Sequence, residues 1–85
     1  MVVRVGILGA TGAVGQRLIQ LVEPNPDFEI VALTASEDSA GHPYREVAKW
    51  RINVPIPERV ADITVGRTTP EDVPDDVDLI FSSLP

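Results

Sequence analysis

The first 22 residues constrain the fold more than any other part of the chain. They open with a run of β-branched and aliphatic side chains, VVRVGIL, which is typical of a strand buried on both faces of a parallel sheet. After Gly9 the spacing changes, and apolar side chains recur three or four positions apart from Val14 to Val22, as they do on one side of a helix. The sequence therefore predicts a strand over residues 2–8, a glycine turn, and a helix over residues 13–22.

The turn between strand and helix, GATGAVG, has a glycine at every third position. Gly9 permits a tight turn, Gly12 leaves room for a diphosphate beside backbone N–H groups, and Gly15 lets the helix sit close to the strand. The free amides and the positive end of the helix dipole then face an anion. None of the 13 acidic residues precedes Glu23, so this helix start is free of negative charge. The pattern indicates a dinucleotide-binding turn, with a tight turn that binds no ligand as the alternative.

The second apolar run, FEIVALT (residues 28–34), completes a strand–helix–strand unit with an expected right-handed crossover. In a dinucleotide fold its end meets the adenosine ribose. A carboxylate there binds the 2′-hydroxyl of NAD, whereas small hydroxyl or basic groups leave room for the 2′-phosphate of NADP. Ser36 and Ser39 favour phosphate, and Glu37 and Asp38 do not. Because Ser36 donates a hydrogen bond without adding charge, the sequence favours NADP, with NAD or a solvated loop without ligand as alternatives.

The rest of the chain has weaker patterns. We expect an irregular connection over residues 51–61, a short strand over 62–65, one helical turn over 70–73, a polar break over 74–76 and a buried strand over 78–82. Ligands of open parallel sheets bind beyond the carboxyl ends of the strands. Gly9, Ser36 and Ser83 each follow such an end, so we expect them to line one crevice.

Composition limits the partners and the compartment. The net charge is −6 with a single lysine, Lys49, which argues against nucleic acid as a partner. The sequence has no signal peptide, no apolar run near ~18 residues and no cysteine, so we expect a cytoplasmic protein without membrane contact or disulfides. We expect no metal site. The acidic, lysine-poor composition fits either a high-salt habitat or an ordinary acidic protein.

The length of 85 residues is enough for one small core but short for a complete nucleotide-binding enzyme, which normally needs a second domain for its substrate. The chain ends directly after an apolar run, where a sheet is expected to continue. We therefore expect residues 1–85 to be the amino-terminal part of an α/β dinucleotide-binding domain. Its Rossmann-like parallel sheet, with flanking helices, would be truncated by the end of the chain, and a catalytic and dimerisation domain would lie outside this sequence.

One set of motifs extends over essentially the whole chain. The segment GATGAVGQRLIQLVEPNPDFEIVALTASEDSAGHPY, followed by Lys49-Trp50, Pro57-Glu58 and DVDLIFSSLP, resembles the amino-terminal part of aspartate-semialdehyde dehydrogenase of the archaeal and fungal type. The set is specific as a whole, because no single piece of it would suffice.

The resemblance implies cofactor contacts at particular positions. They are the loop around the diphosphate (Thr11, Gly12, Ala13 and Val14), groups around the adenosine 2′-phosphate (Ser36 and Ser39) and the strand end beneath the nicotinamide (Ser83 and Leu84). Together with Gly9 and Gly15 of the turn, these are the expected cofactor-binding residues. The family often has arginine at the position of Asp38 and lysine at that of His42. The strictness of the NADP preference therefore stays open.

Three further side chains have both a functional and a structural interpretation. His42 has the chemistry of an acid–base catalyst, but its Gly-His-Pro context favours a surface turn. Tyr44 and Trp50, in a short helical stretch, have rings that can stack on an adenine. We favour packing for both, with Tyr44 holding the stretch onto the domain and Trp50 covering one edge.

The resemblance also implies a reaction. Members of the family reduce L-aspartyl 4-phosphate to L-aspartate 4-semialdehyde with NADPH through a cysteine thioester, in the biosynthesis of lysine, threonine, methionine and isoleucine. A histidine handles the protons. This chain has no cysteine, so the catalytic residues are expected beyond Pro85 and the 85-residue piece alone is expected to be inactive. A small-molecule substrate and a homo-oligomeric full-length protein are also implied.

Four other kinds of protein remain as alternatives. N-acetyl-γ-glutamyl-phosphate reductase and malonyl-CoA reductase share the fold and the thioester chemistry. An extended short-chain dehydrogenase or epimerase also uses a GATGxxG turn, and a non-enzymatic NAD(P)-binding domain is the fourth. A cysteine in an Asn-Cys-like context within the next domain would distinguish them.

Overall fold

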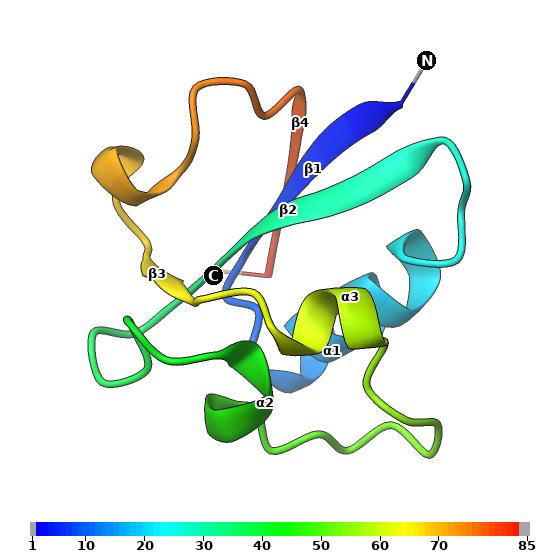
Figure 1. Cartoon of the computed structure of the whole chain (residues 1–85). Helices are drawn as coiled ribbons and strands as arrows, with labels where there is room; N and C mark the ends of the chain where they lie inside the picture. Colours follow the sequence, from blue (N-terminus) through cyan, green and yellow to red (C-terminus); the bar gives the residue numbers. More distant parts are fainter. Residues whose placement is uncertain (1, 84–85) are drawn as a thin grey trace.

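A four-stranded parallel sheet in the order β3-β2-β1-β4 forms the centre of the molecule (Figure 1). The computed structural model describes residues 2–83. In chain order the elements are β1 (Val3–Leu8), α1 (Ala13–Val22), β2 (Phe28–Ala35), α2 (Tyr44–Val47), α3 (Glu58–Ala61), β3 (Gly66–Arg67), the 3₁₀ turn η1 (Pro70–Asp72) and β4 (Leu79–Ser82). The parallel pairing, with β1 between β2 and β4, confirms the expected Rossmann-like α/β class.

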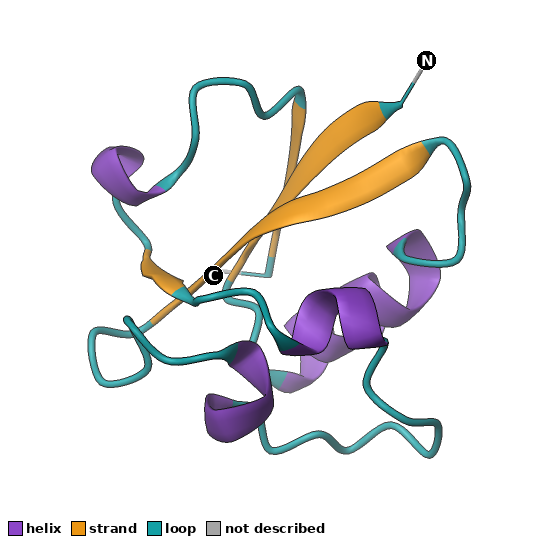
Figure 2. Cartoon of the chain, in the orientation of Figure 1, coloured by secondary structure: helices purple, strands orange, loops and turns teal. Residues whose placement is uncertain are grey.

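The three α-helices gather on one side of the sheet, and η1 lies apart from them between β3 and β4 (Figure 2). The core lies between these helices and the sheet. It combines β-branched and aliphatic side chains of the two central strands with the inward face of α1 and one buried residue from each of α2 and α3. Its members are Val5, Ile7, Ala10, Ile19, Val22, Ile30, Leu33, Ala35, Tyr44, Val60 and Val65.

The predicted strand–helix–strand unit is confirmed. The helix has the expected bounds of 13–22, and the second strand runs one residue further than expected, to Ala35. The middle of β1 is buried, as its apolar run indicated, because helices cover one face and neighbouring strands flank both edges. The helical turn expected over residues 70–73 is η1, a 3₁₀ turn that ends at Asp72.

Two expectations for the middle of the chain were wrong. Residues 51–61 do not stay irregular throughout, because α3 begins after Pro57, whose φ of −56° suits a helix start, and buries Val60. The strand expected over residues 62–65 is not part of the sheet. Val65 instead bonds to the loop before α2, accepting from the Gly41 N–H and donating to the His42 carbonyl, so sheet pairing begins only at Gly66.

The expectations for the last strand and the short helix were only partly correct. The strand expected over residues 78–82 forms as β4, but Leu79 and Ile80 are 37% and 47% exposed and not buried, because β4 is the edge strand of the described sheet. The helical stretch that begins at Tyr44 ends at Val47, so Trp50 lies outside it. No helix within residues 2–83 combines the length and apolar character that a membrane crossing requires.

Candidate functional site

A cleft of about 590 Å³ lies at the carboxyl ends of the parallel strands. The ends of β1, β2, β3 and β4 all contribute to it, as expected for an open parallel sheet. Its lining residues are Gly9, Thr11, Gly12, Ala35, Ser36, Glu37, Arg67, Thr68, Thr69 and Ser83. The expectation that Gly9, Ser36 and Ser83 line one crevice is therefore confirmed.

The start of α1 has backbone amides that its own helix does not use. The first helical hydrogen bond runs from the Gln16 N–H to the Gly12 carbonyl at 2.9 Å, so the preceding amides have no acceptor within the helix. Gly12 is the N-cap residue, and it supplies no side-chain cap. The first turn contains no acidic residue. This helix end therefore combines free donors with the positive end of the dipole, which suits an anion.

The three glycines of the turn have the distinct geometries that the sequence predicted. Gly9 has a φ of +74°, a conformation that favours glycine. A Cβ at Gly12 would meet nothing closer than the Gly9 carbonyl oxygen at 3.9 Å, so it would extend into open space beside the cleft. A Cβ at Gly15 would lie 2.2 Å from the Gly9 carbonyl oxygen and 2.8 Å from the Ala10 Cα. Gly15 thus allows the close approach of α1 to β1, and Gly12 leaves space at the cleft.

Three successive carbonyl groups of the glycine turn accept hydrogen bonds from side chains of three different segments. The Ser83 hydroxyl donates to Gly9 O at 2.8 Å. The Tyr44 phenol donates to Ala10 O at 2.7 Å, and the Gln16 amide donates to Thr11 O at 3.0 Å. Each bond fixes the backbone of the turn and offsets negative charge on an oxygen beside the candidate anion site.

Gln16 also joins the turn to the segment after α2. Its side chain is 1% exposed, donates to the Lys49 carbonyl at 2.9 Å and accepts from the Arg51 N–H at 2.7 Å. Lys49 and Arg51 line a second hollow of about 390 Å³ together with Thr11, Gly12 and Ala13. Two cationic side chains therefore flank the start of α1, which further favours an anion there.

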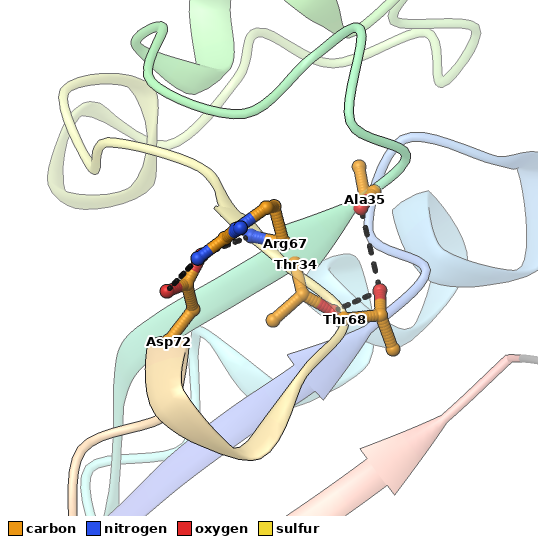
Figure 3. A network of polar contacts seen from close by, with 5 residues as sticks. All are labelled: Thr34, Ala35, Arg67, Thr68 and Asp72. Carbon is orange, nitrogen blue, oxygen red and sulfur yellow. Dashed lines mark hydrogen bonds and ion pairs between the residues drawn. The ribbon is translucent and has the colours of Figure 1, made fainter.

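One side of the cleft is formed where β2 and β3 end side by side. Ala35 pairs with Arg67 in the sheet, so Ser36 and Thr68 follow at the same edge. The Thr34 and Thr68 hydroxyl oxygens are 2.9 Å apart, and the Thr68 hydroxyl lies 3.4 Å from the Ala35 carbonyl (Figure 3). These contacts hold the end of β3 against the end of β2, which positions Arg67 next to the serine that follows β2.

Arg67 itself is bound to Asp72 of η1. Its backbone N–H donates to Asp72 Oδ2 at 2.7 Å, and its Nε donates to the same oxygen at 3.1 Å (Figure 3). These hydrogen bonds hold the pKa of the Asp72 carboxyl below its ordinary value, and the bond from the Arg67 side chain contributes most. The pKa of Arg67 is raised chiefly by the same side-chain bond and less by the charges of Glu37 and Glu71. Both members of the pair are therefore charged at neutral pH.

The other expected site residues lie around this cleft without lining it. Ala13 borders the neighbouring hollow, and Val14 is 60% exposed on the first turn of α1. Gly15 is buried, and Ser39 donates its N–H to the Ser36 carbonyl at 3.0 Å within the turn after β2. Leu84 lies outside the described residues. No group of three or more His, Asp or Glu side chains is arranged as metal ligands within residues 2–83.

The aromatic residues and the histidine have structural positions. His42 is exposed in a turn, as favoured by its sequence context. Tyr44 is fully buried, which excludes stacking on an adenine, and its ring meets Trp50 edge to face with centroids 6.3 Å apart. Burial raises the pKa of the Tyr44 phenol above its ordinary value. The phenol therefore stays protonated and donates to Ala10.

Sequence reasoning did not identify Arg67, Thr68 or Gln16 as part of the site. A signal for the first two was present, because Arg67 is the last residue of a short strand and Thr68 follows it. The prediction missed this signal because it placed the strand at residues 62–65 instead of 66–67. For Gln16 no comparable signal exists, because a single polar residue in an amphipathic helix does not reveal which distant carbonyl groups it contacts.

Comparisons with known proteins show which family this chain is similar to. The model of the family described as "Semialdehyde dehydrogenase, NAD binding domain" matches residues 4–85. The chain is 53% identical over 83 residues to an aspartate-semialdehyde dehydrogenase of Methanothermobacter thermautotrophicus, an alignment that covers 98% of this chain and 24% of the relative. It is 47% identical over 81 residues to the aspartate-semialdehyde dehydrogenase of Trichophyton rubrum, covering 95% and 22%.

A solved structure is also similar. The crystal structure of aspartate-semialdehyde dehydrogenase with NADP from Candida albicans matches all of this chain with a TM-score of 0.93 and 45% sequence identity, over 24% of its own length. The chain thus spans about a quarter of the length of the curated relatives it matches. Because the family model covers residues 4–85, nearly the whole sequence, this chain belongs to the semialdehyde dehydrogenase family, in the part matched by its NAD-binding domain.

Proposed function

We propose that this chain supplies the NADP site of an aspartate-semialdehyde dehydrogenase. In the full-length protein, L-aspartyl 4-phosphate would be reduced by NADPH to L-aspartate 4-semialdehyde and inorganic phosphate. The single observation that carries the proposal is the start of α1, where unused amides, an uncharged first turn and an open Gly12 adjoin the cleft at the strand ends. Similarity to a relative whose structure contains NADP supports the same cofactor.

The residues of this chain would bind and orient the cofactor. The amides around Gly12 would donate to the diphosphate, with Lys49 and Arg51 adding positive charge nearby. Ser36 would face the adenosine ribose, and Ser83 would lie toward the nicotinamide end. When bound, the reduced nicotinamide supplies the hydride for the reaction. We propose the same cofactor-binding set as the sequence analysis, namely Gly9, Thr11, Gly12, Ala13, Val14, Gly15, Ser36, Ser39, Ser83 and Leu84.

The acyl chemistry would belong to another part of the full-length protein. A thiolate would attack the acyl carbon of the aspartyl phosphate, releasing phosphate, and hydride addition to the resulting thioester would release the aldehyde and the thiolate. This chain contains no cysteine, so residues 1–85 would act as the cofactor-binding part of a larger catalytic unit. We further propose a homo-oligomeric, cytoplasmic enzyme of amino-acid biosynthesis.

The first test measures the reaction in the reverse direction. The full-length protein is expected to reduce NADP when given L-aspartate 4-semialdehyde and inorganic phosphate, and to stop when phosphate is omitted. Activity only with N-acetyl-γ-glutamyl semialdehyde or with malonate semialdehyde and coenzyme A would identify one of the related reductases. Binding of NADP without any of these activities would favour a non-enzymatic domain or a short-chain dehydrogenase and contradict the proposal.

The second test changes the cofactor site alone. Gly12→Val adds a side chain where no atom lies closer than 3.9 Å, so the fold is expected to persist while the diphosphate space is filled. NADPH affinity, measured by fluorescence titration of the full-length protein, is expected to fall by at least about tenfold, the equivalent of about one good charged hydrogen bond. A folded variant with unchanged affinity would remove the cofactor assignment.

A further inference from the structure

We propose that Arg67 recognises the adenosine 2′-phosphate and thereby gives this protein its preference for NADP over NAD. This inference rests on the proposed cofactor site. It assigns the specificity to a residue at the end of β3, whereas the sequence motif pointed to the loop after β2. Arg67 would take the role for which the family often has an arginine at position 38 or a lysine at position 42, where this chain has Asp38 and His42.

The sheet register brings Arg67 to the place where the 2′-phosphate would bind. Arg67 pairs with Ala35, the last residue of β2, and both lie at the carboxyl edge of the sheet. Ser36 follows directly, and Ser36 and Arg67 line the same cleft as Gly12 at the start of α1. A nucleotide with its diphosphate at Gly12 and its adenosine ribose near Ser36 therefore meets the end of β3.

Among the described residues that line this cleft, Arg67 is the only cation. Glu37 also lines the cleft, whereas Asp72, which binds Arg67, does not. Asp38 and His42 do not line it, and Asp38 adds no positive charge. Of the charged side chains that line the cleft, Arg67 would attract a phosphate at this position and Glu37 would repel it, which makes Arg67 decisive for the discrimination between the two nucleotides.

The contact with Asp72 orients the guanidinium without using all of it. Asp72 accepts from Nε at 3.1 Å and from Nη2 at 3.4 Å, so Nη1 has no partner among residues 2–83. The Arg67 side chain is 48% exposed. A guanidinium held along one edge keeps donors for a second anion, and arginine binds phosphate through such paired N–H groups. The Asp72 contact therefore limits the loss of side-chain freedom on binding.

The test compares NADPH and NADH affinities of the full-length protein and its variants by fluorescence titration. Arg67→Ala is expected to weaken NADPH binding about tenfold and to change NADH binding by less than about twofold, since only NADPH has the 2′-phosphate. Glu37→Gln is expected to tighten NADPH relative to NADH, because it removes the opposing charge. The matched control is Arg45→Ala, which removes an exposed arginine paired with Asp62 outside the cleft and should leave the affinity ratio unchanged.

Asp72→Asn separates recognition from a structural role. It weakens the contact to η1 but keeps the positive charge of Arg67, so the NADPH to NADH ratio should not fall. An unchanged ratio in Arg67→Ala, or an equal fall in Arg67→Ala and Asp72→Asn, would overturn the inference while the cofactor site stands. Failure of the wild-type protein to bind either nucleotide would instead overturn the proposed function and this inference with it.

Discussion

Gly12 and Gly15 are three positions apart in the same turn, but they serve different purposes. The space beside Gly12 is open, whereas Gly15 is surrounded by backbone atoms of the turn. Gly12 therefore leaves space beside the cleft, and Gly15 allows the packing of α1 on β1. The sequence spacing predicted the packing role of Gly15, because in a strand–turn–helix unit the third glycine is the one at the helix–strand contact.

The two glycines are expected to respond differently to the same substitution. Gly15→Ala places a methyl group 2.2 Å from the Gly9 carbonyl oxygen, and backbone cannot give way cheaply, so we expect a loss of at least about 2 kcal/mol in the free energy of unfolding. Gly12→Ala is the matched control and should cost less than about 1 kcal/mol. Denaturant midpoints of the two variants measure the difference. Equal losses would mean that α1 does not approach β1 as closely as described.

Tyr44 links the short helix α2 to the glycine turn between β1 and α1. Its phenol donates to the buried Ala10 carbonyl at 2.7 Å, so Tyr44→Phe leaves that oxygen without its side-chain donor. We expect a loss of about 1–2 kcal/mol in the free energy of unfolding, the usual cost of an unsatisfied buried acceptor. Urea unfolding at neutral pH measures it, and a variant as stable as the wild type would show that the bond is not needed.

The difference in stability between the wild type and Tyr44→Phe is expected to depend on pH. Burial raises the pKa of the Tyr44 phenol in the folded state above the value near 10 expected in the unfolded chain. The stability contributed by the protonated phenol is therefore complete below about pH 10 and is lost as the pH rises further. The stability difference between the wild type and Tyr44→Phe should shrink above that pH. A difference that grows there would contradict the assignment.

At the scale of elements, the turn between β1 and α1 is held by residues from outside it. Donors come from α1 itself, from α2 and from the segment after β4, each to a different carbonyl. These bonds hold the backbone of the turn in place, which would reduce the entropy lost if an anion binds there. Among these donors Gln16 has the most contacts, because it also holds the segment after α2.

A change at Gln16 should therefore affect the turn and that segment together. In Gln16→Glu a carboxylate oxygen would face the Thr11 and Lys49 carbonyl oxygens in a buried position, and both hydrogen bonds would be lost. We expect a cost of roughly 2–4 kcal/mol in the free energy of unfolding. The matched control is Gln20→Glu on the same helix, whose side chain accepts an exposed hydrogen bond from Arg17 at 3.0 Å. Thermal unfolding measures the stability of both variants. An equal loss of stability in Gln16→Glu and Gln20→Glu would argue against the interior role of Gln16.

The elements that sequence predicted well are those whose hydrophobic period is unambiguous. β1, α1 and β2 have strong apolar patterns that match their burial in the core. Residues 51–67 have only short apolar groups, with prolines at positions 55 and 57, and there the prediction failed. Pro57 started a helix instead of preventing one, and Val65 was buried by contacts to the loop before α2 instead of by the sheet.

The candidate site divides in the same way. Residues that follow well-predicted strands, such as Gly9 and Ser36, were identified because the carboxyl edge of a parallel sheet is known once the strands are known. Arg67 was missed because its strand is two residues long and is defined only by pairing with β2. Partners of single polar side chains, such as the carbonyl groups that Gln16 contacts, depend on tertiary contacts that no local pattern encodes.

At the scale of the whole molecule, three properties converge on one edge. The carboxyl ends of four strands, the positive end of α1 and the cations of two flanking segments surround adjoining hollows. The chain as a whole has a net charge of −6, so this local arrangement, and not the overall charge, would attract an anionic nucleotide. The chain spans about a quarter of the length of the curated relatives it matches.

The crystal structure of the full-length protein with NADP tests the central claim most directly. The account predicts diphosphate oxygens within hydrogen-bonding distance of the backbone amides that follow Gly12 at the start of α1, with the adenosine ribose near Ser36. A diphosphate bound elsewhere, with those amides covered by another part of the protein, would contradict it.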